Sequence, residues 1–136
     1  MPHQHPFRQR VRVLAGTGTY TDVRFGPVEP GRFYHIGRFA AEDETSQPTG
    51  DIRIFVDGHG YSHLLLEQDA PAVATLYWEN EPTFLLEGES LVARFTGPTA
   101  NDVLQLYLEG WWVELDNPGH LGRRPITEEM AEEVMG

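Results

Sequence analysis

The chain has 136 residues, of which 40% are hydrophobic and 11% aromatic, as expected for one folded domain with a single core. It has no cysteine, which excludes disulfides, a thiol nucleophile and cysteine-ligated metals. The net charge of −11 argues against nucleic acid as the main partner, because phosphate contacts need clustered cations. No apolar run has the length of a membrane span or a signal peptide, so we expect a protein without a membrane partner that is used without secretion.

The first seven residues contain two prolines and two histidines, and we expect them to form an extended N-terminal arm (1–7). From residue 8, apolar and polar residues alternate in segments bounded by Gly, Pro, Asp and Asn, which is typical of β-strands. These segments are FRQRVRVL, TYTDVRF, RFYHIGRFAA, DIRIFV, SHLLLEQ, AVATLYW, TFLL, SLVARF and VLQLYLEGWWVEL. They predict an all-β fold over residues 8–116, an antiparallel β-sandwich or jelly-roll-like barrel of about eight strands.

The last predicted strand changes phase near its middle. The leucines of LQLYL share one face, but beyond Gly110 the apolar residues move to the other face. A one-residue β-bulge near Glu109–Gly110 would keep both sets on the core side. It would leave Trp112 on the outer face near Tyr107, either half covered by a loop or free as an interface anchor.

The C-terminal tail (117–136) is predicted to contain a short helix in RPITEEMAEEVMG. Thr127 is a suitable N-cap, and Glu128 and Glu129 fall in the first turn, where the helix dipole favours anions. A helix of this length needs a packing partner. All ten basic residues are arginine, which reflects either genome composition or the suitability of arginine for interfaces.

The segment DGHGYSH (57–63) has the residue types of a metal site. On a strand, His59 and His63 would lie about 13 Å apart, whereas two ligands of one zinc ion must approach to about 3.5 Å. The segment therefore predicts a hairpin turn at Asp57-Gly58, and we expect no metal.

Residues suited to catalysis are not grouped in any familiar pattern. No serine lies in a nucleophile elbow, and AGTGTYT lacks the lysine of a phosphate loop. The acids of AEDE and YWENEP fall in predicted turns. The hypothesis of a small β-barrel enzyme therefore has no group of catalytic residues to support it. We expect no catalytic residues, no cofactor and no enzyme activity.

The order of the segments resembles that of small β-sandwich virion proteins of tailed bacteriophages, which decorate or cement capsids. The likeness covers residues 8–115 and rests on GTGTYT, PGRFYHIGRFAA, LYWENEPTFLLEGESLVARFTG and DVLQLYLEGWWVEL. It implies a structural protein of the capsid surface, made in the host cytoplasm. By the same likeness, we expect a homotrimer that binds the major capsid protein.

Two hypotheses for function remain open. In a decoration protein, the interface with neighbouring subunits or the shell would be formed by Phe7, Arg8, Arg10, Arg12, Tyr107 and Trp112. In the alternative, a carbohydrate-binding β-sandwich, stacking platforms for sugars would be formed by Tyr107 with Trp112, or by Tyr77 with Trp78.

Overall fold

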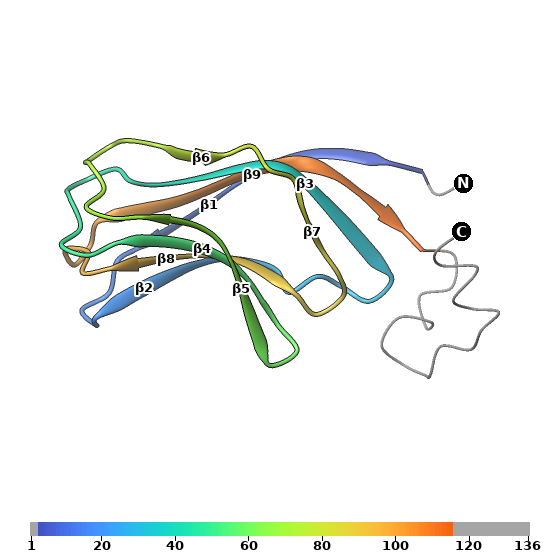
Figure 1. The fold of residues 1–136 in the computed structure, drawn as a ribbon, viewed down its shortest axis with the longest axis horizontal. Helices are drawn as coiled ribbons and strands as arrows, with labels where there is room; N and C mark the ends of the chain where they lie inside the picture. The colour runs from blue at the N-terminus through green and yellow to red at the C-terminus, as the bar shows by residue number, and fades with distance from the viewer. Residues whose placement is uncertain (1–2, 116–136) are drawn as a thin grey trace.

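The computed structural model describes residues 3–115, which form nine strands in two antiparallel sheets packed face to face (Figure 1). The strands are β1 (His5–Leu14), β2 (Tyr20–Phe25), β3 (Arg32–Asp43), β4 (Ile52–Gly58), β5 (Tyr61–Gln68), β6 (Tyr77–Glu79), β7 (Thr83–Leu85), β8 (Ser90–Thr96) and β9 (Val103–Glu114). Sheet A has the order β1-β9-β3-β6, with β7 also paired to β3, and sheet B has the order β2-β8-β4-β5. The predicted all-β sandwich is confirmed, with nine strands.

The core lies between the two sheets and is formed by the inward-facing residues that alternate along the strands of both sheets. Its fully buried side chains include Ile36, Phe39, Ile52, Ile54, Leu85, Leu91, Phe95, Leu104 and Leu106. Burial of each such side chain stabilises the fold by about 1.5–3 kcal/mol.

Sheet A contains a β-bulge in β3, and not in β9 where we predicted one. The register between β1 and β9 runs without a shift from His5↔Trp112 to Leu14↔Val103. The shift lies in β3, between Ile36 and Arg38. A side chain at Gly110 would overlap the carbonyl oxygen of His35, so the two strands approach closely only because residue 110 has no Cβ. The prediction of a bulge at Glu109–Gly110 in β9 is therefore wrong.

The hairpin between β4 and β5 turns two residues later than predicted. Its central residues are His59 and Gly60, both with positive φ (52° and 82°), as a type I′ turn requires. Asp57 and Gly58 are the last residues of β4. The His59 ring lies against the loop between β7 and β8, with Nε2 at 2.8 Å from the carbonyl oxygen of Glu87.

The first strand begins earlier than the predicted start of the sandwich domain at residue 8. His5, Pro6 and Phe7, which we assigned to an N-terminal arm, are the first residues of β1 and pair with β9. The predicted C-terminal helix and tail lie outside the described residues. Within residues 3–115 no helix has the length and apolar character that a membrane crossing requires.

Candidate ligand-binding face of sheet A

Three adjacent rows of side chains on the outer face of sheet A cross the strands at the level of Glu109, Tyr107 and Gln105. Residues directly opposite each other in antiparallel strands point to the same face, so the register defines each row. The charged row is Arg8, Glu109 and Arg38; the aromatic row is Arg10, Tyr107, Ala40 and Trp78; the amide row is Arg12, Gln105 and Glu42.

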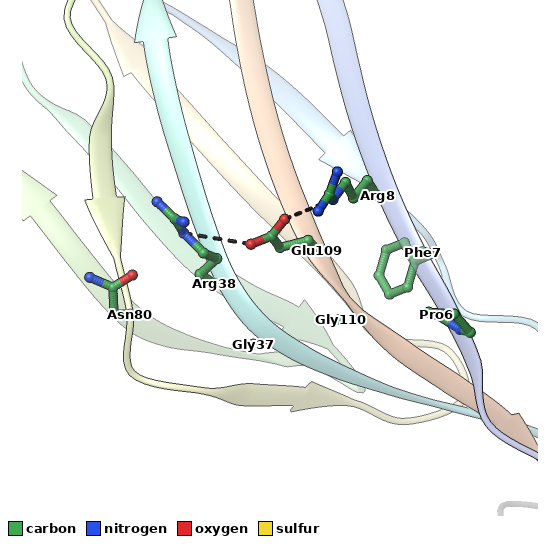
Figure 2. Close-up of a pocket in the computed structure, with 8 residues that line it drawn as sticks. All are labelled: Pro6, Phe7, Arg8, Gly37, Arg38, Asn80, Glu109 and Gly110. Atoms are coloured by element: carbon green, nitrogen blue, oxygen red, sulfur yellow. Dashed lines mark ion pairs between the residues drawn. The ribbon is translucent and has the colours of Figure 1, made fainter.

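In the charged row, one carboxylate lies between two guanidinium groups, as Figure 2 shows. Glu109 Oε2 is 3.2 Å from Arg8 Nε, and Glu109 Oε1 is 3.7 Å from Arg38 Nε. Exposed ion pairs of this kind contribute only about 0–1 kcal/mol each. Both arginines can therefore turn toward a ligand at small cost.

In the aromatic row, two rings meet over a small residue. Ala40 is opposite Tyr107 on one side and Trp78 on the other, and it is 0% exposed. The Trp78 and Tyr107 ring centroids are 6.5 Å apart with an interplanar angle of 37°. The Arg38 guanidinium lies 3.9 Å from the centre of the Trp78 ring, and Trp78 nevertheless stays 39% exposed.

In the amide row, hydrogen bonds hold the polar groups in place. The Tyr107 hydroxyl donates to Gln105 Oε1 at 2.8 Å, and Gln105 Nε2 donates to Glu42 Oε1 at 3.1 Å. Gln105 is 0% exposed and Glu42 is 8% exposed. Burial raises the pKa of Glu42, and the negative charge of Glu44 raises it further. The chain of bonds fixes the orientation of the Tyr107 ring.

Two hollows lie side by side along these rows and share Arg8 and Glu109. The larger, of about 770 Å³, is lined by Pro6, Phe7, Arg8, Gly37, Arg38, Asn80, Glu109 and Gly110 (Figure 2). The smaller, of about 260 Å³, is lined by Arg8, Gln9, Arg10, Trp78, Tyr107, Leu108 and Glu109. Together they form an open strip across β1, β9 and β3, which suits an extended ligand.

The structure separates the aromatic residues that the sequence suggested as partners. Trp112 lies on the opposite face from Tyr107, stacked on His5 at 4.1 Å between centroids and under the guanidinium of Arg32. The proposed pairing of Tyr107 with Trp112 is therefore wrong, because β9 runs without a bulge. Tyr77 packs against the core, so Tyr77 and Trp78 point to opposite faces of β6.

The predicted interface residues are also divided between the faces of β1. Arg8, Arg10 and Arg12 lie on the outer face of sheet A with Tyr107. Phe7 is half-buried and packs on Phe25 and Tyr34, with centroids 5.9 and 5.4 Å away. The sequence alone did not single out Arg38, Gln105 or Glu109, since their roles depend on which strands are neighbours. Their alternation with core residues was the one signal that they point outward.

Among the described residues, one group of acids has the spacing of a cation site: Asp51, Glu67 and Asp69. The Arg53 side chain already bridges it, with Nε at 3.0 Å from Asp51 and an Nη at 3.1 Å from Glu67. The histidines of DGHGYSH lie elsewhere, His59 in the turn and His63 opposite Val56.

No family model matches the chain, and no curated protein matches it. Among solved structures, a CBM4 domain is similar, with a TM-score of 0.36 and 17% identity over 77% of this chain and 82% of that chain. The exo-β-1,3-galactanase of Phanerochaete chrysosporium, solved with galactose, has a TM-score of 0.35 and 12% identity over 79% of this chain. The match spans 29% of the galactanase. Scores this low do not indicate what this chain binds.

Proposed function

We propose that the outer face of sheet A binds a carbohydrate. The observation that carries the proposal is the pair of aromatic rings, Trp78 and Tyr107, flanked by fixed hydrogen-bonding side chains. A sugar ring has an apolar C–H face, which packs on an aromatic ring, and a rim of hydroxyls, which pair with planar polar groups. The aromatic row supplies the first kind of contact, and the charged row supplies the second.

The shape of the face favours a polymer over a single sugar. The two hollows follow each other and are open, and they share the side chains of Arg8 and Glu109. A chain of several sugar units would cross both, with one unit on the Trp78–Tyr107 pair and the next at the ion pairs. Because hydrogen bonds already hold the Tyr107 ring and the amide row in place, binding on these side chains costs little ordering.

The direct test is a glycan array followed by titration calorimetry on the polysaccharides that bind. Trp78→Ala and Tyr107→Ala should each weaken binding at least tenfold. Tyr20→Ala is the matched control, because Tyr20 is 50% exposed but lies on sheet B. Equal losses in all three variants, or no binding by the parent chain to any glycan, would overturn the proposal.

The capsid-decoration hypothesis stays a prediction, and it is independent of the carbohydrate proposal. Its resemblance rests on the order of the strands, and the sandwich fold is common to many functions. A homotrimer is the expected oligomeric state, and light scattering of the full chain measures it. Binding to purified capsids, with and without Arg8, Arg10 and Arg12 replaced by glutamine, tests the expected contact with the major capsid protein.

A further inference from the structure

We infer that the carbohydrate bound by sheet A is acidic, and that Arg10 is the residue that pairs with its carboxylate groups. This inference rests on the proposed function and names the class of its ligand. It follows from a difference in charge pairing between the two outer faces of the sandwich.

On the outer face of sheet B, each arginine has carboxylate partners within the protein. Arg24 is 3.1 Å from Asp57, and Arg94 binds both carboxylate oxygens of Asp22, at 2.8 and 2.9 Å. Arg53 is held by Asp51 and Glu67. These cations are neutralised in place, so they offer little attraction to an anion.

On sheet A, the charged and aromatic rows contain three arginines, Arg8, Arg10 and Arg38, but only one carboxylate, that of Glu109. Arg8 and Arg38 share Glu109. For Arg10, no described residue supplies a carboxylate within ion-pair distance, and its side chain is exposed. Glu42 of the next row is hydrogen-bonded to Gln105; burial raises the pKa of Glu42 and the positive charge of Arg10 partly lowers it, but the two side chains do not form an ion pair. A local excess of positive charge therefore lies beside the two aromatic rings, in a chain whose net charge is −11.

Arg10 is also positioned to bind a substituent of a sugar that is stacked on Tyr107. It is directly opposite Tyr107 in the register of β1 and β9, and it lines the smaller hollow with Trp78. Cross-strand neighbours have Cβ atoms about 5 Å apart, so a carboxylate carried by a sugar on Tyr107 would reach the guanidinium. The planar guanidinium can bind both oxygens of a carboxylate at once.

The acidity of the whole chain does not prevent this pairing. Charges separated by more than about 8 Å are largely screened at physiological ionic strength. Arg10, which has no ion-pair partner among residues 3–115, and the pair of arginines that share Glu109 therefore dominate the potential beside the two rings, while acids beyond this distance slow the approach of a ligand only at low salt.

The test uses uronate-containing polysaccharides and the same polysaccharides after carboxyl reduction, which converts each uronate into a neutral sugar. A panel of polygalacturonate, alginate and hyaluronan is titrated with the parent chain, Arg10→Gln, Arg24→Gln and Trp78→Ala. Arg24→Gln is the matched control, since it removes the same charge from sheet B. A sulfated polymer is included because sulfate offers a similar anion.

We expect the parent chain to bind at least one uronate polymer tenfold or more tightly than its reduced form. Arg10→Gln should remove that preference and leave binding to the reduced form unchanged, whereas Arg24→Gln should behave as the parent. If the sulfated polymer binds more strongly and Arg10→Gln loses this binding, the ligand is still an acidic carbohydrate, but its anionic group is sulfate. Equal binding to acidic and reduced forms would overturn the inference and leave the carbohydrate proposal standing. Binding to no polymer of either kind would overturn both.

Discussion

Trp78 in β6 and Tyr107 in β9 are both directly opposite Ala40, so their rings meet over one methyl group with centroids 6.5 Å apart. The two strands are not neighbours, because β3 lies between them in sheet A. A small residue in the middle strand is what lets the two rings lean over it. The aromatic platform is therefore a property of three strands together.

The first prediction concerns this alanine. Ala40→Leu should push the rings apart, because Ala40 is fully covered and has no space for a larger side chain. We expect a loss of about 1–3 kcal/mol in the free energy of unfolding, which urea denaturation measures. Binding to glycans should fall as it does in Trp78→Ala. Unchanged affinity in a folded variant would show that the ring pair is not the platform.

Glu109 should act as an internal competitor of an acidic ligand. Glu109→Gln frees Arg8 and Arg38 from their shared carboxylate. We expect up to tenfold tighter binding of the acidic polymer, and a change of at most about 1 kcal/mol in stability, because the pairs are at the surface. Glu114→Gln is the control, since it lies in the same strand but pairs with Arg32. Weaker binding in Glu109→Gln would indicate instead that its carboxylate contacts the sugar hydroxyls.

Asp43 should make stability depend on pH. Asp43 is 1% exposed, and burial, then the neighbouring Asp102 carboxyl, raise its pKa from 3.8 to about 6. The folded state therefore keeps a proton that the unfolded chain has already lost. The stabilisation from this proton is fully present below pH 3.8 and disappears as the pH rises through about 6.

The measurement is urea denaturation of the parent chain and Asp43→Asn at several pH values. Relative to the variant, the parent should lose about 2–3 kcal/mol between pH 4 and pH 7, since each unit of pKa corresponds to about 1.4 kcal/mol. Asp69→Asn, a substitution at an exposed position, keeps Asp43 and should therefore show the same pH dependence as the parent chain. A constant difference between parent and Asp43→Asn would contradict the prediction.

Gly110 should be among the least tolerant positions of sheet A. A Cβ there would overlap the carbonyl of His35, where β9 meets the bulge of β3. Gly110→Ala should cost about 2–4 kcal/mol, because backbone must move to relieve the overlap. Gly16→Ala has open space around it and should change stability by less than about 1 kcal/mol. Thermal unfolding of both variants, with circular dichroism, makes the comparison.

Alternation along each strand was enough to predict much of this protein. It indicated an all-β sandwich and the core side of the leucines in β9. These properties are local, because successive side chains of a strand point to opposite sides whatever the rest of the chain does. The same rule places Tyr77 and Trp78 on opposite faces, so they could not form one platform.

Which residues share a face across strands was decided by the tertiary structure alone. The sequence pattern after Gly110 predicted a bulge in β9, but β9 stays in phase, so Trp111 lies on the outer face of sheet A, where its ring stacks on His35. Gly110 lies against His35 beside the bulge of β3, and the unbroken register of β9 turns Trp112 away from Tyr107. Strand order then brings Trp78, Tyr107 and Arg10 into one row, since pairing between distant segments depends on the packing of the whole sheet.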